Sequence, residues 1–429
     1  MDPKAANGKR TDNETTKRLI LPTSVTRRTF IRSTGLVAGA VAAGPLLSAC
    51  GAIGGGSGGG GPLKIGLLLP YSDIYAVLGE SITESMKMYF ENNGNEAGGR
   101  TIEIIQEDTQ LKPDVALEKA RKLVEQDEVD LVAGIVSSGV AVGLRDYFHE
   151  NKKLLLIANA GANVLTRAKK SPYIFRTSFS NWQPNWPLGN WAYDNVAQKV
   201  FVTAPDYGAG HDMVSAFLNS FEGKGGQLVA EPQFTPFPQM GDPAPFITEI
   251  QQANPDMVYT FYSGGAAVTF VKAYGEFGLT GQIPLVAAGF TVEEDVLPAQ
   301  GDAALGTVSG LHWALQLENS TNMTFTAAYK ERTGKDANVF AMQGYDTARV
   351  IVDSINAVEG NTTDLDPLID AIAGVSFDSP RGTFKFDETT HNVVNPVYIR
   401  RVEEVDGALH NVIIDELGDY VDPGDDSKG

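Results

Sequence analysis

The sequence predicts an α/β protein with two doubly wound lobes, each built on a parallel sheet, that are joined by three crossings. Short apolar runs, typical of strands buried on both faces, alternate with segments of helical periodicity. Repeated strand–helix units imply right-handed crossovers and therefore parallel strands. The alternation lapses at three places, which is why two lobes are expected rather than one.

The first series of elements begins at Leu63. Residues 63–69 form a nearly continuous apolar run that Pro70 ends, as expected for a strand buried on both faces. The following segment is predicted to be a helix because apolar residues recur on one face, at Leu78, Ile82, Met86 and Phe90. Further strands are predicted at 101–106, 130–136 and 154–158, with helices at 114–126 and 139–150.

The second series follows the same rhythm. Strands are predicted at 200–204, 227–231, 257–261 and 285–288, and helices at 209–222, 243–253 and 265–277. The crossings between lobes are placed at 172–191, 307–315 and 376–400, where the rhythm lapses.

Composition excludes several classes of protein. The 429 residues carry a net charge of −19, which argues against nucleic-acid binding, because phosphates need a basic surface. A single cysteine excludes internal disulfides and thiolate metal clusters, and none of the five histidines is paired at ligand spacing. No metal and no cofactor are therefore predicted.

The N-terminal segment has the layout of an export signal. Residues 1–49 hold eight basic and three acidic residues, so the chain from Cys50 onward carries −24. Arg27-Arg28 resembles a twin-arginine motif, and Leu47-Ser48-Ala49-Cys50-Gly51 resembles a lipobox, in which the cysteine is lipidated. The alternative for Cys50 is an incidental buried thiol. We expect a signal peptide at 1–49 and a lipidated Cys50 with a glycine-rich tether at 50–62.

Candidate binding residues follow the predicted strands, because ligands of open parallel sheets bind beyond the carboxyl ends of the strands. They are Ser137, Ser138, Asn159, Ala160, Gly161, Ala162, Tyr207, Tyr262 and Ser263. Small residues admit a ligand to the backbone, hydroxyls donate to a carboxylate, and tyrosine offers an apolar face with one hydroxyl. The alternatives are helix capping for the serines and core packing for the tyrosines.

A family resemblance accompanies these positions. The run from Leu63 to about Asp415 resembles the periplasmic solute-binding proteins of ABC importers, in the branched-chain amino-acid and amide branch. The matching pieces are Lys64-Ile65-Gly66, Leu69-Pro70-Tyr71-Ser72, Gly134-Ile135-Val136-Ser137-Ser138, Ala160-Gly161-Ala162-Asn163, Phe175-Arg176-Thr177, Asp206-Tyr207-Gly208 and Gly344-Tyr345-Asp346. The resemblance implies the type I periplasmic-binding-protein fold, whose two lobes close over a solute.

The resemblance also implies boundaries and roles. One lobe is expected to comprise 63–180 with 312–376, the other 181–311 with 377–420, and 421–429 is expected to be a disordered tail. The loops at Ser137-Ser138 and Ala160–Ala162 match segments that hold a ligand carboxylate, and Tyr207 matches a residue that covers the ligand. Further family contacts fall near Tyr71, near Gln343 with Phe340, and near either Tyr262 or Ser263.

One departure from the family concerns the ligand. Amino-acid binders place an acid after the strand equivalent to 285–288, but this chain reads Ala287-Ala288-Gly289-Phe290-Thr291. A buried ammonium without a counter-charge is costly, so we favour a carboxylate with an apolar or aromatic body. Phe290 and Trp182 are candidate ring contacts, with core packing as the alternative. Rotation of Glu293 or Glu294 toward the ligand would restore an amino-acid site.

We therefore expect an exported, lipid-anchored solute-binding protein. It lies in the periplasm or on the outer face of the cytoplasmic membrane, and delivers a small organic solute to an ABC permease. A ligand-sensing protein of the same fold is the alternative. An enzyme is not expected, because the sequence contains no phosphate loop and no paired catalytic carboxylates, and its Gly-x-Ser-x-Gly run at 55–59 lies in the glycine-rich tether, which no predicted strand precedes.

Overall fold

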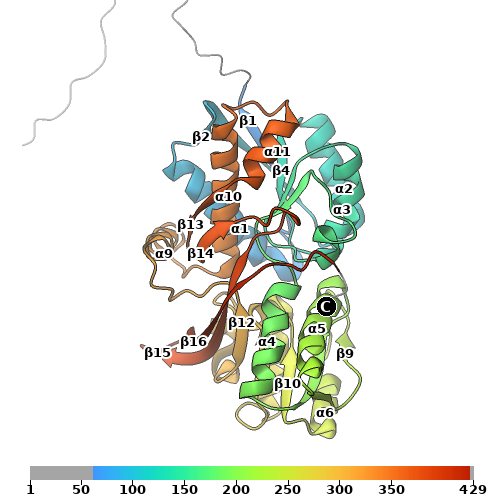
Figure 1. Ribbon diagram of the computed structural model, residues 1–429. Helices are drawn as coiled ribbons and strands as arrows, with labels where there is room; N and C mark the ends of the chain where they lie inside the picture. Colours follow the sequence, from blue (N-terminus) through green and yellow to red (C-terminus); the bar gives the residue numbers. More distant parts are fainter. Residues whose placement is uncertain (1–60, 426–429) are drawn as a thin grey trace, which may run out of the picture. The chain divides into compact units, whose positions relative to one another are not determined.

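Two open sheets organise the chain in the computed structural model, which describes residues 61–425 (Figure 1). The first sheet has the order β2-β3-β1-β4-β5-β6 and is parallel except for the β2–β3 pair. Its strands are β1 Leu63–Leu69, β2 Glu96–Ala97, β3 Arg100–Asp108, β4 Leu131–Gly134, β5 Leu155–Ile157 and β6 Ile174–Arg176.

Helices from two separate stretches of the chain surround this sheet. The first stretch supplies η1 Asp73–Tyr75, α1 Ala76–Asn92, α2 Pro113–Arg121, η2 Lys122–Gln126, α3 Ser138–Glu150 and η3 Asn163–Thr166. The second supplies α9 Ser320–Thr333, α10 Val339–Ala357 and α11 Leu365–Ala373. Helices α1 and α10 lie side by side (Figure 1). A Cβ on Gly344 of α10 would lie 2.4 Å from the Ile82 carbonyl oxygen, so this contact requires glycine.

The second sheet has the order β16-β15-β12-β11-β10-β7-β8, and β9 also pairs with β7. Its strands are β7 Lys199–Pro205, β8 Gln227–Leu228, β9 Gln233–Thr235, β10 Met257–Thr260, β11 Leu285–Ala288, β12 Val308–Leu311, β15 Asn395–Val405 and β16 Ala408–Tyr420. The pairs β12–β15 and β15–β16 are antiparallel, so the sheet is parallel except at this edge.

Helices also accompany the second sheet. They are α4 Trp182–Asn195, α5 Gly208–Gly223, α6 Ala244–Ala253, α7 Gly264–Glu276, η4 Gly289–Val292, α8 Leu297–Gln300 and η5 Gly301–Ala304. Helices α4 and α5 run side by side (Figure 1). The short pair β13 Ser376–Ser379 and β14 Gly382–Lys385 forms a sheet of its own.

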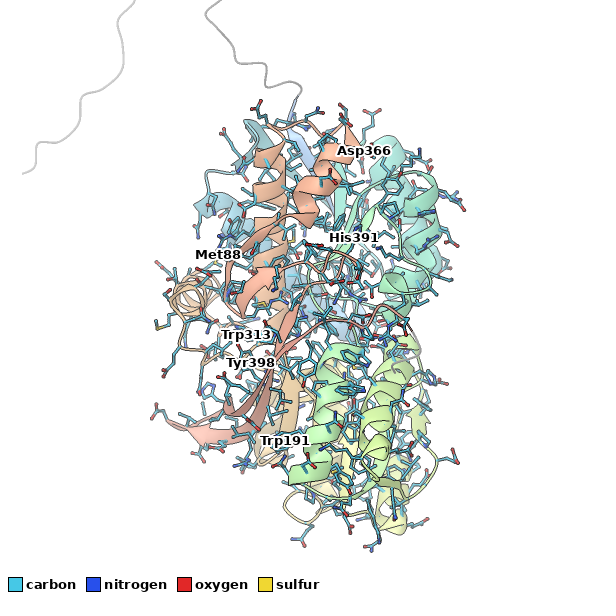
Figure 2. All side chains as sticks on the ribbon, viewed as in Figure 1. Met88, Trp191, Trp313, Asp366, His391 and Tyr398 are labelled. Atoms are coloured by element: carbon cyan, nitrogen blue, oxygen red, sulfur yellow. The ribbon has the colours of Figure 1, made fainter. Side chains whose placement is uncertain are left out.

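Three crossings join the two sheets, as the sequence predicts, but two of the predicted segments also contain strands: 307–315 contains β12, and 376–400 contains β13, β14 and the start of β15. The crossings run between β6 and α4, between β12 and α9, and between β14 and β15. Trp313 lies on the second crossing and Tyr398 lies just after the third; Figure 2 shows both near the middle of the view. The expected α/β fold with two doubly wound lobes is therefore confirmed.

The segment 172–191, expected as a crossing throughout, differs from that expectation. It contains strand β6 and most of helix α4, despite Pro184 and Pro187. Pro184 lies in the first turn, where a backbone N–H has no partner within the helix. Pro187 lies inside the helix, which packs against α5, β12 and β15. This tertiary packing outweighs the unfavourable helix propensity of proline.

The C-terminal end also differs from the expected disordered tail. Asp422 is buried, and its Oδ1 lies 3.2 Å from Nε of the buried Arg167. An ion pair with both partners buried ties this part of the chain to the loop after η3. Residues 426–429, like the signal peptide, Cys50 and the tether up to residue 60, lie outside the described residues.

Candidate ligand-binding site

Strand order places two loop pairs at the same point of the fold. In each sheet the winding direction reverses beside the first strand of the lobe: between β1 and β4 in one, and between β7 and β10 in the other. Ligands of open α/β sheets bind at such reversals, beyond the carboxyl ends of the strands. The segments that follow these four strands supply Tyr75, Val136, Tyr207 and Phe261 to one cavity.

This cavity has an empty volume of about 300 Å³. This figure includes open solvent at the mouth of the cavity; the space inside that admits a water-sized molecule is about 20 Å³. Fifteen residues line it: Tyr75, Leu78, Val136, Ser138, Asn159, Gly161, Phe179, Asn181, Tyr207, Ala209, Met213, Phe261, Ser263, Phe290 and Phe340. None of these lining residues is an aspartate, glutamate, lysine or arginine.

Four phenylalanines form a wall of the cavity around Phe290. The ring centroid of Phe290 lies 4.9 Å from that of Phe179, 5.9 Å from Phe340 and 6.4 Å from Phe261. The four rings come from four separate segments of the chain, and all are buried. Such a wall offers both ring faces and ring edges to a planar ligand.

The polarity of the cavity comes from uncharged groups and helix termini. Helices α3, α5 and α7 all begin at the cavity, where Ser138, Ala209 and Ser263 line it. The first N–H groups of a helix lack partners within it and carry partial positive charge, which favours an anion. The site therefore suits a carboxylate without any lysine or arginine.

Contacts between the lobes close the cavity. The hydroxyls of Tyr75, from η1, and Tyr207, at the start of α5, lie 3.1 Å apart. Burial raises the pKa of Tyr75 to about 12 and raises that of Tyr207 well above its usual 10, so both hydroxyls stay protonated at neutral pH. The Asn163 backbone N–H also donates to Oδ2 of Asp212, on α5, at 3.0 Å. The structure therefore has the lobes in contact on either side of the cavity.

Glu293, one of two acids that could have paired with a ligand ammonium, forms its contacts away from the cavity. Its Oε2 lies 2.9 Å from Nη1 of Arg400, and its Oε1 accepts the Val339 N–H at 2.8 Å. Both side chains of this ion pair are fully buried. Glu294 accepts hydrogen bonds from Asn411, and it contacts His410. Neither acid lines the cavity.

Six of the predicted site residues come together around the cavity: Ser138, Asn159, Gly161, Tyr207, Ser263 and Phe290. They lie in both lobes, at the ends of β4, β5, β7, β10 and β11. Residues that follow these strands meet because parallel strands of one sheet present their carboxyl ends at a common edge.

The other predicted residues lie outside the lining. Ser137 precedes α3 as its N-cap, and Ala160 and Ala162 pack in the core under β4 and β5. The Gln343 Oε1 accepts a hydrogen bond from Nδ2 of the lining residue Asn159 at 2.7 Å, so Gln343 holds a lining side chain without lining the cavity itself.

Three predicted aromatic contacts also lie elsewhere. Tyr262 is fully buried, and its hydroxyl is 3.1 Å from those of Thr203 and Thr235, so it packs in the core. The hydroxyl of Tyr71 lies 2.8 Å from that of Thr83. Trp182 stacks on Trp186, with ring centroids 5.3 Å apart, at the start of α4.

Phe340, which lies near a family contact region together with Gln343, also lines the cavity. The remaining eight lining residues are not singled out by the sequence: Tyr75, Leu78, Val136, Phe179, Asn181, Ala209, Met213 and Phe261. Phe261 stands next to the predicted Tyr262, and Phe179 and Asn181 lie in the first crossing. A crossing that passes the mouth of two sheets necessarily borders the space between them, which is the signal that could have found these two residues.

In residues 61–425, no group of three or more histidine, cysteine, aspartate or glutamate side chains is arranged to hold a metal ion. In the same part of the chain, the helices are too short or too polar to cross a bilayer.

Known solute-binding proteins are similar to this chain over most of its length. Residues 62–408 match the profile of the family described as "Periplasmic binding protein". The solute-binding protein of an ABC transporter from R. palustris, solved in complex with benzoate, is 35% identical, with a TM-score of 0.80 over 84% of this chain and 98% of that one. A solute-binding protein from Rhodopseudomonas palustris BisB5, in complex with 3,4-dihydroxybenzoic acid, is 32% identical, with a TM-score of 0.81 over 85% and 99%.

A curated relative points to the same group. The Leu/Ile/Val-binding protein homolog 6 of Brucella melitensis is 29% identical over 84% of this chain and 93% of its own length. The chain therefore belongs to the periplasmic binding protein family, among the solute-binding proteins of ABC transporters. This is a family of exported, substrate-binding proteins rather than enzymes, and the resemblance stated from the sequence motifs is confirmed.

Proposed function

We propose that this protein binds a small aromatic carboxylate in the cavity between its lobes and delivers it to an ABC permease. The cavity supplies a phenylalanine wall for a ring and three helix N-termini for an anion. In this proposal the protein is exported by the signal in residues 1–49 and held at the membrane through lipid on Cys50.

The observation that carries the choice of ligand is the absence of acidic side chains from the cavity lining. An α-amino acid would bury its ammonium beside phenylalanines and neutral polar groups, at a cost of several kcal/mol. Glu293 is held by Arg400 and the start of α10 and does not supply the missing charge. The benzoate and dihydroxybenzoate complexes of relatives 35% and 32% identical support the same choice.

Binding and release follow from closure of the lobes. A ligand that contacts both lobes only when they are closed stabilises the closed form by its differential affinity. Tyr75 and Tyr207 meet across the cavity in that form. In this proposal the solute leaves the site chemically unchanged when the lobes part.

A ligand panel tests the proposal. Benzoate, hydroxybenzoates, leucine and valine are each added to the purified protein, and its melting temperature is measured. An aromatic acid at 100 times its Kd stabilises by about 2.7 kcal/mol, a rise of about 3–4 °C for a folded body of this size. Leucine or valine as the strongest stabiliser would contradict the aromatic-acid assignment.

A matched pair of variants locates the binding. Phe290→Leu alters the ring wall, whereas Phe386→Leu alters a buried phenylalanine outside the cavity. Both variants lose stability, since each leaves a small void in a packed region. Only Phe290→Leu is expected to weaken the best ligand, by about tenfold in calorimetry. Equal affinities in the two variants would place the ligand elsewhere.

A further inference from the structure

Asn181 lines the cavity and has an unpaired hydrogen-bond acceptor. It lies on the first crossing as the N-cap residue of α4, is fully buried, and lines the cavity. An N-cap asparagine ordinarily accepts a hydrogen bond from the first turn of its helix, but this side chain makes no such bond. Its Oδ1 has no hydrogen-bond partner among the described residues.

The position of Oδ1 is set by the neighbouring chain. A Cβ placed on Gly161, another lining residue, would lie 2.3 Å from Asn181 Oδ1. The oxygen therefore lies directly against the bare Cα of Gly161. Glycine at this position leaves room for the amide at the edge of the cavity.

The orientation of the amide is set by Asp212. The Nδ2 of Asn181 donates to Asp212 Oδ2 at 3.0 Å, and the same oxygen accepts the Asn163 backbone N–H at 3.0 Å. Since Oδ2 already accepts a backbone N–H, it acts as an acceptor toward Asn181 as well. Rotating the amide by half a turn would set two acceptor oxygens against each other, so Oδ1 stays beside Gly161, a residue of the lining.

A buried acceptor without a partner costs free energy, which a suitable ligand group recovers. A second carboxylate would be repelled by Oδ1. An ammonium would meet no acid in the lining, and Asp212 Oδ2 is already engaged by two donors. An uncharged O–H on the ligand satisfies Oδ1 without either penalty.

We propose that Asn181 is a specificity-determining residue, which accepts a hydrogen bond from a ring hydroxyl of the bound aromatic carboxylate. The preferred ligand is thus a hydroxylated benzoate rather than benzoate itself. This inference rests on the proposed function and adds to it the residue that distinguishes ligands within the class.

The test compares ligands on the unaltered protein first. Calorimetry gives Kd for benzoate and for 2-, 3- and 4-hydroxybenzoate, each beside its fluorobenzoate isomer, which has a similar shape and no donor. The best hydroxybenzoate is expected to bind at least tenfold more tightly than benzoate and than its fluoro counterpart, a ratio typical of one neutral hydrogen bond to a buried group. This comparison needs no variant to fold.

Variants then assign the preference to Asn181. Asn181→Leu should reduce the hydroxybenzoate-to-benzoate ratio to about twofold or less. Asn195→Leu is the matched control, since Asn195 is exposed at the other end of α4, and it should keep the ratio.

Each outcome decides between the two proposals. If benzoate binds as tightly as every hydroxybenzoate, or if Asn181→Leu keeps the full ratio, the role of Asn181 is wrong and the proposed function stands. If no aromatic acid binds, the proposed function fails and this inference fails with it.

Discussion

Folding destabilises the charged form of the Asp295 carboxyl group. Its Oδ1 is buried with no hydrogen-bond partner among the described residues, and the neighbouring acids Glu293 and Glu294 add like charge. Burial first, and then the charge of Glu293, raise the pKa of Asp295 from its usual 3.8 to about 8. Glu293, by contrast, has Arg400 as an ion-pair partner.

The pKa of Asp295 predicts how stability depends on pH. An acid whose pKa is higher in the folded than in the unfolded state binds more protons when folded. Its contribution to stability is present at low pH and is lost as pH rises from about 4 to about 8. Asp295→Asn removes this loss, so the variant should gain melting temperature over the unaltered protein between pH 5 and pH 9.

The control for this measurement is Asp302→Asn, which removes an equal charge from an exposed position. Melting curves across pH that run parallel for the unaltered protein and Asp295→Asn would show that Asp295 has no raised pKa.

The start of helix α7 packs against the short helix η1 of the other lobe. Gly264, the first residue of α7, has φ +55°, and a Cβ there would lie 2.3 Å from the Ile74 carbonyl oxygen. Backbone meets backbone at this point, so a neighbouring side chain cannot move to make room. The closed arrangement of the two elements therefore requires glycine for both conformation and space.

Gly264→Ala is expected to weaken ligand binding by tenfold or more, because the added methyl group keeps the lobes apart. Gly278→Ala is the matched control: its φ is +75°, but a Cβ there meets nothing within 4 Å. Both variants carry the left-handed backbone penalty of about 1–2 kcal/mol. Calorimetry measures affinity, and small-angle X-ray scattering with saturating ligand should show a more open average for Gly264→Ala alone. Equal affinities would mean that this contact does not limit closure.

At the scale of the whole molecule, the predicted anchor concerns residues outside the described range. The basic signal at 1–49, Cys50 and the glycine-rich segment before Leu63 predict a globular body tethered to a membrane surface. The body carries the acidic excess, which an anionic bilayer does not attract. Retention at the membrane would therefore depend on lipid.

Cys50→Ser is predicted to move the exported protein from the membrane fraction to the soluble fraction. Ser57→Ala, within the glycine-rich tether, is the control and should leave the protein membrane-bound. Fractionation and mass spectrometry of the N-terminal peptide measure the two effects. Unchanged membrane retention of Cys50→Ser would refute the anchor.

Much of the fold was predictable because its determinants are local. The strand at 63–69 and the strand at 285–288 have the predicted bounds, since an apolar run ended by Pro70 or by glycine is a signal within a few residues. Helix α4 was not predicted, because its two prolines oppose a helix locally and only packing against α5 and the second sheet favours it.

The candidate site was predictable to the extent that strand ends define it. Tyr207 and Tyr262 both follow strands, yet Tyr207 lines the cavity whereas Tyr262 bonds to Thr203 and Thr235 in the core. Periodicity does not decide which of these two directions a residue after a strand takes. Asn181 belongs to a crossing, where no periodic pattern exists.

The sequence by itself determined the two-lobed α/β class, the three crossings and the absence of an acidic residue directly after β11, because each depends on residue order along the chain. Only the tertiary structure decided that Glu293 pairs with Arg400, 107 residues away, and that the Asn181 acceptor is left unpaired beside the cavity lining. Those outcomes depend on which distant groups meet in the folded chain, and burial makes each unpaired or paired polar group energetically significant.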